Sequence, residues 1–305
     1  MAILTLKQLR YFEAVAVHGH FGHAADACGV TQPALSMQIK ELEQTLATPL
    51  FERGIKQIRL TGFGEDIAPR VRDILRAVDE LEDLARTASD DRLHRLRLGV
   101  IPTIAPYLLP KLIGQLKVQS PGLDIHIREA ITSKLIEELQ DGRLDVALVA
   151  LPVSEPALTE FALFDETFVL VRPEADAALP VPNAEALREM RLLLLEEGHC
   201  FRDQALSFCK LGPARPREIL EASSLATLVQ MVGAGMGVTL IPEMAVKIET
   251  RSAAVSLARF TPPEPARKIG MIWRKRSPLA EQTAELAGQM RAILALSDED
   301  QVTST

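Results

Sequence analysis

The feature that most constrains the fold is a long stretch, residues 64–89, with no glycine after its first residue and only one proline. Its apolar residues recur in steps of four and three, the heptad spacing of a helix that buries one stripe. The stripe consists of Ile67, Val71, Ile74, Val78, Leu81 and Ala85. Such a helix either packs on its own protein or forms a dimer seam. We expect the first five residues to dimerise, because a long helix between two domains has no other core to face.

This helix divides a chain of 305 residues, which is too long for one ordinary core. The expected parts are an N-terminal domain at residues 1–61, a linker helix at 62–92 and a C-terminal domain at 93–305. The net charge of −7 argues against a uniformly basic nucleic-acid binder. The first part carries six Lys and Arg against five Asp and Glu, whereas the linker carries five against nine. Any contact with DNA must therefore be local.

The N-terminal part reads as three short helices separated by tight turns. The first helix ends at Gly19 and the second at Gly29, and Thr31 is expected to cap the third. Two short extended pieces follow, residues 49–52 and 57–60, joined by a basic turn. Two helices that meet at a Gly-Val-Thr turn, followed by a basic hairpin, predict a winged helix-turn-helix.

The third of these helices has two different faces. Its apolar stripe is formed by Leu35, Ile39, Leu42 and Leu46. The opposite face carries Gln32 and Ser36, whose side chains can hydrogen-bond base edges, and Lys40, which can meet a phosphate. Arg53, Lys56 and Arg59 of the hairpin can also meet phosphates. The alternative is an ordinary solvated helix face and a basic hairpin without a nucleic-acid partner.

Beyond Arg95 the pattern changes to alternating strands and helices, typical of parallel-rich sheets with helices on both faces. The expected strands are residues 96–101, 123–129, 145–151, 166–172, 192–195, 219–222, 237–240 and 269–274. The expected helices are residues 105–119, 133–140, 201–208, 225–233 and 279–296. Lobe I is expected at about residues 93–164 and 268–305, and lobe II at about 165–267. The predicted fold is α/β, with a ligand cleft between two lobes.

The cellular compartment decides how the cysteines are interpreted. The first residues lack the apolar run of a signal peptide, and no stretch approaches the roughly 20 apolar residues of a membrane span. We therefore expect a cytoplasmic protein, in which thiols are kept reduced. Cys28, Cys200 and Cys209 are then either inert core thiols or reactive ones. Cys28 lies among alanines and is expected to be a small core residue.

Three histidines, His18, His20 and His23, lie close to Cys28 and raise the question of a metal site. Their spacing spans a loop and the start of a helix rather than one helix face, and no second cysteine accompanies them. We therefore expect no metal site, and we expect no cofactor.

The segment GHCFRDQALSFC contains the other two cysteines. If residues 201–208 are helical, Cys200 is the N-cap, and Asp203 occupies the capping-box position. Unpaired backbone N–H groups, together with His199 and Arg202, would favour the thiolate at Cys200. The thiolate is the form of cysteine that reacts with peroxide.

The spacing of Cys200 and Cys209 is informative about any bond between them. Nine residues of helix rise roughly 13.5 Å and place the two side chains on opposite faces. A disulfide requires Cα atoms within about 7 Å. If the two cysteines pair, the helix must unwind first, and the segment becomes a two-state element. The alternative is two unrelated core cysteines on an amphipathic helix.

A family resemblance covers the whole chain. The stretch FGHAADACGVTQPALSMQIKELE at residues 21–43, followed by PLFER and LTGFGE, resembles the signature of LysR-type transcriptional regulators. Members of that family have a winged helix-turn-helix, a dimerising linker helix and a two-lobed effector domain like a periplasmic binding protein. Many carry a basic residue where this chain has Met37. The expected DNA-binding residues are Thr31, Gln32, Pro33, Ser36, Lys40 and Arg53.

The cysteine segment is similar to the redox segment of the peroxide-sensing branch of that family. IPTIAPYLLP at residues 101–110, EAIT at 129–132 and EPARKIG at 264–270 also match. The resemblance implies that hydrogen peroxide oxidises Cys200 to a sulfenic acid, which Cys209 resolves as a disulfide. The residues expected to shape the peroxide pocket are Thr103, Thr132, His199, Arg202, Asp203 and Arg267. Lys268 is an alternative to its neighbour Arg267, since a shift of one residue would exchange them.

The same resemblance implies the partners. They are promoter DNA, hydrogen peroxide, further copies of the chain in a homodimer or homotetramer, RNA polymerase, and a thiol reductant such as glutaredoxin or thioredoxin. The expected function is activation of genes of peroxide defence rather than catalysis. Two alternatives stay open: a LysR-type regulator gated by a small metabolite, with incidental cysteines, and a thiol peroxidase that uses Cys200 as its nucleophile.

Overall fold

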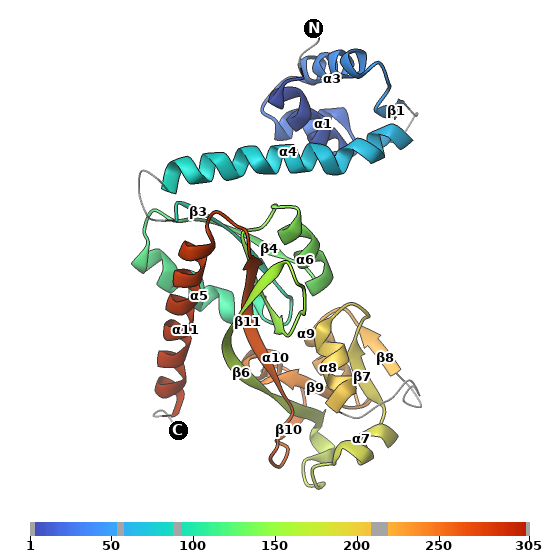
Figure 1. The fold of residues 1–305 in the computed structure, drawn as a ribbon. Coiled ribbons are helices and arrows are strands. Elements are labelled where there is room, and N and C mark those ends of the chain that lie inside the picture. Colours follow the sequence, from blue (N-terminus) through green and yellow to red (C-terminus); the bar gives the residue numbers. More distant parts are fainter. Residues whose placement is uncertain (1–3, 54–57, 88–92, 209–218, 303–305) are drawn as a thin grey trace. The chain divides into compact units, whose positions relative to one another are not determined.

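The structure is a computed structural model that describes residues 4–53, 58–87, 93–208 and 219–302 (Figure 1). It divides into two compact units, Met1–Arg86 and Thr87–Thr305. We call them the N-terminal unit and the effector unit, and each is described by itself. None of the described helices combines the length and the apolar character needed to cross a membrane.

The N-terminal unit is a winged helix-turn-helix followed by a long helix. Its elements are α1 (Leu6–His18), α2 (Phe21–Ala27), α3 (Gln32–Leu46), β1 (Phe51–Arg53), β2 (Ile58–Leu60) and α4 (Gly62–Thr87). Thr5 and Gln8 form a capping box at α1, and Gly19 ends that helix with a φ of 59°, which favours glycine. Thr31 occupies the N-cap of α3, but its side chain makes no capping hydrogen bond, contrary to expectation.

The core of this unit includes the predicted stripe of α3. Leu35, Ile39 and Leu42 are buried there. Helix α4 contributes Ala68, Val71 and Leu75 to the same core. Val71 therefore belongs both to the predicted seam and to the core of the unit.

The rest of the seam is more exposed. Ile74 is 46% exposed and Leu81 66% exposed, whereas Val71 is only 4% exposed. The helix can therefore both pack on its own protein and dimerise. Its first half contributes to the core of the unit, and its second half presents apolar side chains to solvent. Dimerisation stays a prediction.

The effector unit has two sheets. Its first elements are β3 (Arg95–Val100), α5 (Ala105–Gln119), β4 (Asp124–Glu129), α6 (Thr132–Gln140), β5 (Val146–Leu151), β6 (Leu158–Pro173) and the 3-10 turn η1 (Glu174–Asp176). They continue as α7 (Ala184–Glu189), β7 (Leu192–Leu195), α8 (Cys200–Phe208), β8 (Ile219–Ala222), α9 (Leu225–Gly233), β9 (Thr239–Pro242), α10 (Glu243–Glu249), β10 (Val255–Ala258), β11 (Ala266–Arg274) and α11 (Ala280–Val302).

The large sheet has the order β10-β6-β11-β5-β3-β4, and β9 also pairs with β6. Strands β3, β4 and β5 are parallel, as are β7 and β8 in the small sheet. Strand β11 runs antiparallel to both β5 and β6. The prediction of parallel-rich sheets holds for β3, β4 and β5 and for the small sheet. It is wrong for the rest of the large sheet, where β6 and β11 pair antiparallel with all their neighbours.

Strand β6 begins at Leu158, eight residues earlier than predicted. Its first part pairs with β11, from Arg274 opposite Leu158 to Ala266 opposite Thr167, and this pairing extends the strand. Its second part pairs with β9 and β10. One strand therefore belongs to both lobes, whose hydrophobic cores are separate. The predicted α/β fold, with a winged helix-turn-helix, a long helix and a two-lobed effector unit, is confirmed.

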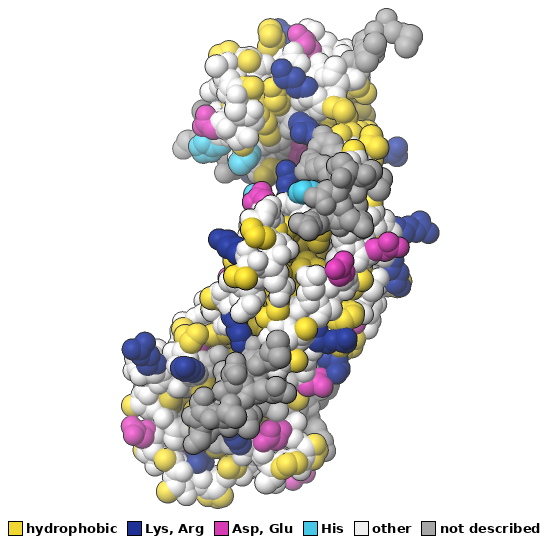
Figure 2. Space-filling view, turned by 90° about the vertical axis from the view of Figure 1, so that its left-hand side faces the viewer, with side chains coloured by type: hydrophobic (Ala, Val, Ile, Leu, Met, Phe, Trp, Pro, Cys, Tyr) yellow, Lys and Arg dark blue, Asp and Glu magenta, His cyan; other side chains and the backbone are white. Residues whose placement is uncertain are grey.

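Charged side chains are mixed over the surface. On the face drawn in Figure 2, basic, acidic and hydrophobic side chains are interspersed. The acidic side chains on this face are scattered and do not form one patch.

Candidate functional site

Helix α8 begins at Cys200, directly after a turn that contains Gly198. Gly198 has a φ of +95°, and a Cβ there would lie 3.1 Å from Cδ1 of Ile131. The turn therefore requires glycine. The carbonyl of His199 accepts a hydrogen bond from the backbone N–H of Arg202 at 3.0 Å. His199 therefore precedes the helix, and Cys200 is its first residue rather than its N-cap, contrary to the prediction. The third helical position is then Arg202, so Asp203 does not occupy the predicted capping-box position.

Cys200 lines a narrow cavity formed by three segments of the effector unit. The turn after β3, the start of α6 and the start of α8 meet there. The lining residues are Ile101, Pro102, Thr103, Ile131, Thr132, His199, Cys200 and Phe201. Three of the predicted pocket residues, Thr103, Thr132 and His199, are therefore brought together beside the thiol.

The hydroxyl of Thr132 is the unusual group of this cavity. Its Oγ1 atom is buried and has no hydrogen-bond partner within the described part of the chain. A buried hydroxyl without a partner loses its bonds to water and gains nothing in return. Thr132 therefore offers an unused hydrogen-bonding group beside the Cys200 thiol.

Arg267 lies behind the cavity and is fully buried. Its Nη1 donates to Thr103 Oγ1 at 2.7 Å, its Nη2 to the Thr103 carbonyl at 3.0 Å, and its Nε to Glu166 Oε2 at 2.7 Å. The guanidinium carbon also lies 5.3 Å from the centre of the Phe201 ring, a cation–π contact. Arg267 therefore acts on the cavity through Thr103 and Phe201, which line it.

The structure distinguishes Arg267 from its neighbour. Lys268 is exposed and its Nζ pairs with Asp165 Oδ1 at 2.7 Å. Successive residues of strand β11 point to opposite faces, so only one of the two can reach Thr103. That residue is Arg267.

Glu166 was not predicted from the sequence. Its Oε1 accepts a hydrogen bond from the backbone N–H of Met244 at 3.2 Å, and its side chain is 3% exposed. Burial raises the pKa of Glu166, and the charge of Arg267 opposes that rise. The sequence shows only a glutamate beside an apolar strand segment. It does not reveal the ion pair, because Arg267 is 101 positions away.

His199 does not supply the charge that the sequence suggested. The ring is partly buried, and burial lowers its pKa, an effect that Glu196 opposes. The neutral imidazole is therefore favoured.

Arg202 and Asp203 lie away from the cavity. The Nη1 atom of Arg202 donates to the Leu195 carbonyl at 2.9 Å and to Glu221 Oε1 at 2.7 Å. The side chain of Asp203 is exposed. The helical rotation of about 100° per residue places Arg202 on the opposite side of α8 from Cys200.

Cys209 lies outside the described residues. Helix α8 is described from Cys200 to Phe208, so the predicted helical separation exists up to that point. The eight steps between these residues rise roughly 12 Å.

The expected DNA-reading face lies at the start of α3. Gln32, Pro33 and Lys40 are exposed, and Ser36 is partly exposed. Thr31 is exposed too. The side chain of Arg53 lies outside the described residues. Met37, at 56% exposed, is on the surface beside these residues.

The histidines near this helix have a structural role. His20 caps α2, since its Nδ1 accepts a hydrogen bond from the backbone N–H of Gly22 at 3.0 Å. Its ring centre lies 4.7 Å from that of His23. Among the described residues, no group of three or more His, Cys, Asp or Glu side chains could hold a metal ion. Cys28 is half-buried, and burial raises the pKa of its thiol.

A winged helix-turn-helix, a long helix and a two-lobed α/β unit together define a DNA-binding regulator with an effector domain. Residues 6–65 match the family of bacterial regulatory helix-turn-helix proteins, lysR family, and residues 89–295 match the LysR substrate binding domain. The chain belongs to the LysR family.

Relatives in the family carry more specific names. The chain is 43% identical over 292 residues to a probable hydrogen peroxide-inducible genes activator of Streptomyces viridosporus, covering 94% of this chain and 93% of that protein. It is 39% identical over 293 residues to the DNA-binding transcriptional dual regulator OxyR of Escherichia coli K12, covering 95% of each.

Solved structures agree with these relatives. A full-length OxyR variant from Pseudomonas aeruginosa matches with a TM-score of 0.74 and 36% identity over 95% of each chain. A peroxide-bound OxyR mutant from Corynebacterium glutamicum matches with a TM-score of 0.65 and 34% identity, covering 95% of this chain and 92% of that one.

Proposed function

We propose that the protein is a peroxide-responsive transcription activator that controls genes of peroxide defence. Hydrogen peroxide oxidises Cys200, and a reversible disulfide with Cys209 is the active state. The observation that carries this proposal is the position of Cys200 at the start of α8, in a cavity with the unpartnered hydroxyl of Thr132. The names of the relatives support the same signal.

The first step is nucleophilic. The Cys200 thiolate attacks one peroxide oxygen, the O–O bond breaks, and the other oxygen leaves as hydroxide, which takes a proton to become water. The sulfenic acid on Cys200 then reacts with the Cys209 thiol, forming the S–S bond and releasing a second water. Peroxide is the oxidant for both electrons, and a thiol reductant such as glutaredoxin or thioredoxin restores the dithiol.

The residues around the cavity orient peroxide. Thr132 and Thr103 offer hydroxyls to the two peroxide oxygens, and His199 in its neutral form can accept or donate a hydrogen bond. Arg267 polarises Thr103, which stabilises the developing hydroxide. Arg202 anchors the first turn of α8 to Leu195 and Glu221.

The DNA-binding part of the proposal rests on α3. Thr31, Gln32, Pro33, Ser36, Lys40 and Arg53 contact promoter DNA in the cytoplasm. Two chains are paired through α4 by Ile67, Ile74, Val78 and Leu81, whereas Val71 of the predicted seam is buried in the unit's own core, and two such dimers form a tetramer. Residues 1–61, 62–92 and 93–305 act as the DNA-binding, dimerising and sensing domains, and RNA polymerase is the partner in activation.

The test combines thiol mapping with DNA footprinting on the full-length protein. One equivalent of peroxide should yield a Cys200–Cys209 disulfide peptide and a changed footprint. Cys200→Ser should do neither, and Cys28→Ser should behave as wild type. Normal peroxide activation of Cys200→Ser would overturn the proposal.

A further inference from the structure

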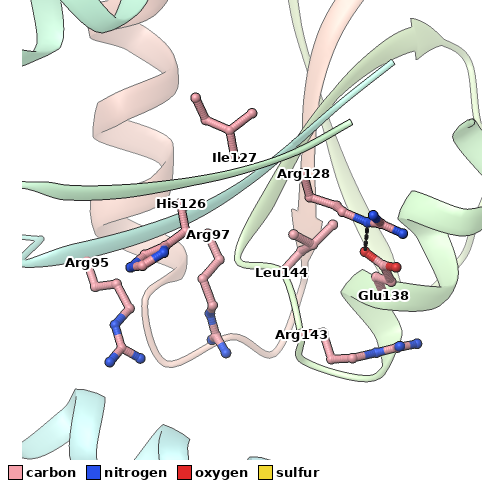
Figure 3. Close-up of a pocket in the computed structure, with 8 residues that line it drawn as sticks. All are labelled: Arg95, Arg97, His126, Ile127, Arg128, Glu138, Arg143 and Leu144. Atoms are coloured by element: carbon pink, nitrogen blue, oxygen red, sulfur yellow. Dashed lines mark hydrogen bonds and ion pairs between the residues drawn. The ribbon is translucent and has the colours of Figure 1, made fainter. Parts of the chain in front are cut away.

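The effector unit has an open pocket of about 390 Å³ on lobe I, separate from the Cys200 cavity (Figure 3). It lies where β3 and β4 begin, whereas the Cys200 cavity takes residues that follow the end of β3. Its lining residues are Arg95, Arg97, His126, Ile127, Arg128, Glu138, Arg143 and Leu144. None of them lines the other cavity.

Strand geometry places the cations on one face. In the parallel ladder Arg97 lies opposite His126, and Gly99 opposite Arg128. Alternate residues of a strand point to the same side, so Arg95 joins this face. Figure 3 shows Arg95, Arg97 and His126 extending from the same side of the two strands, while Ile127 points the other way.

The covering helix leaves part of this face open. Helix α6 and the turn after it pack on the strands at Gly99, where a Cβ would lie 2.8 Å from the side chains of Leu135 and Leu144. The earlier residues of β3, Arg95 and Arg97, carry long polar side chains at the corresponding positions. The pocket therefore lies at the start of β3 and β4, where α6 does not cover the face of the sheet.

Two buried carboxylates hold arginines in place at the pocket. Asp145, 7% exposed, accepts from Arg97 Nη2 at 2.6 Å and from the Arg97 backbone N–H at 2.8 Å. Glu138, 8% exposed, accepts from Arg128 Nε at 3.3 Å. The Arg128 side chain is itself 54% exposed, so its terminal N–H groups face solvent.

Three further groups add to this cluster. Arg95 is exposed and has no hydrogen-bond or ion-pair partner in the described part of the chain. His126 contacts Asp124, with 2.8 Å between Nε2 and Oδ2. Arg143 approaches from the turn after α6, where it pairs with Asp141. The carboxylates neutralise much of the charge, so binding here relies on directed N–H donors more than on net charge.

We propose that this pocket binds a multivalent phosphate anion, either inorganic or the terminal phosphates of a small ester. Guanidinium groups match phosphate oxygens in bidentate pairs. The donors come from β3, from β4 and from the turn after α6. Such an arrangement suits a group with acceptor oxygens on several sides, rather than a planar carboxylate. A phosphate bound here would contact β3, which is the first strand of the effector unit. The site would therefore add a second means of regulating the protein.

The test is calorimetric titration of the full-length reduced protein with inorganic pyrophosphate at constant ionic strength. Wild type should bind it, and Arg95→Ala should weaken binding about tenfold, the loss of one charge-assisted contact. Arg128→Lys keeps a cation beside Glu138 but loses the guanidinium fork, and should also weaken binding. Lys117→Ala removes the same charge from an exposed position on α5 outside the lining and should bind as wild type.

A comparison of ligands identifies the source of the phosphate and distinguishes phosphate from other anions. Tighter binding of a nucleoside diphosphate than of pyrophosphate would indicate a phosphate ester, and the reverse would indicate the inorganic anion. Citrate should bind much more weakly than either. No binding of pyrophosphate by wild type, an equal loss in Lys117→Ala, or equally tight citrate would overturn the proposal.

Discussion

At the scale of single residues, the Cys200 cavity depends on one buried ion pair. Arg267 and Glu166 have side chains that are 0% and 3% exposed, and the arginine spans Thr103, Glu166 and Phe201. A buried charge that loses its partner costs far more than an exposed one.

Glu166→Gln removes the charge that compensates Arg267 and should lower the free energy of unfolding by about 3–5 kcal/mol. Urea denaturation of the reduced protein measures it. The matched control is the preceding residue, Asp165→Asn, whose pair with Lys268 is exposed and worth less than about 1 kcal/mol. Equal, small losses in both variants would show that the buried pair does not organise the site.

His199 should make stability depend on pH. Burial lowers its pKa, so the folded protein binds a proton less readily than the unfolded chain. This contribution to stability is fully present above the ordinary histidine pKa of about 6.5, and is lost as the pH falls through the lower folded value. His199→Gln should therefore lose less stability than wild type when the pH is lowered from about 7.5 to about 5.5.

Urea midpoints at the two pH values check this prediction. His126→Gln is the control, because His126 is 60% exposed. If His199→Gln keeps the full pH dependence of wild type, the histidine is not the group responsible.

The sequence predicted part of this site. Thr103, Thr132 and His199 line the cavity with Cys200, as the motifs indicated. Arg202 bonds elsewhere because it lies two positions further around α8. Glu166 could not be predicted, since its contact with Arg267 depends on the register of two antiparallel strands far apart in the chain.

At the scale of elements, the proposed disulfide would act on α8. Phe201 packs edge-on against Phe168, with ring centres 4.9 Å apart, and lies under Arg267. Pairing of Cys200 with Cys209 requires this helix to unwind. The stability of α8 should therefore control the second oxidation step and not the first.

Ser207 is an exposed position in the last turn of α8 at which helix stability can be tuned. Ser207→Ala and Ser207→Gly differ by about 1 kcal/mol in helix propensity, or about fivefold in an unwinding equilibrium. The glycine variant should close the disulfide faster by about that factor, as rapid acid quenching and mass analysis would show.

The control for this pair is Ala284→Gly, an exposed position on α11. It should leave the closing rate unchanged. Equal closing rates in the two Ser207 variants would contradict a requirement for unwinding.

Helix α4 gives a prediction about assembly. Leu81 is 66% exposed and belongs to the predicted seam. Leu81→Glu should therefore dissociate the dimer in sedimentation velocity without lowering the melting temperature of the N-terminal unit. Val71→Ala is the contrasting variant, because Val71 is buried in the unit's own core and its truncation should lower that melting temperature. An unchanged oligomer in Leu81→Glu would place the seam elsewhere.

The heptad pattern alone could not separate these two roles. It correctly predicted one long helix, but Ala68 and Leu75 pack in the core although they lie outside the predicted stripe. The early half of β6 was missed for a similar reason. Its side chains alternate between buried and exposed, and only the pairing with β11 makes this segment a strand.

At the scale of the whole molecule, the effector unit joins two lobes through β6. The cavity takes Thr103 and Thr132 from one lobe and Cys200 from the other. The repeated strand and helix pattern predicted two lobes, and the LysR family confirms the fold class. The antiparallel centre of the large sheet was not predictable from local patterns, since strand order depends on contacts between distant segments.

Unwinding of α8 would withdraw Phe201 from Arg267, the residue of lobe II whose guanidinium also donates to Thr103 of lobe I. This is how a single covalent bond can alter the whole effector unit.

The most direct test of this account is amide hydrogen exchange of residues 200–208 in the full-length protein, reduced and after one equivalent of peroxide. The account predicts slow exchange in the reduced protein and fast exchange in the fraction that carries the Cys200–Cys209 disulfide, with no change around Cys28. A disulfide that forms while these amides stay protected would contradict it.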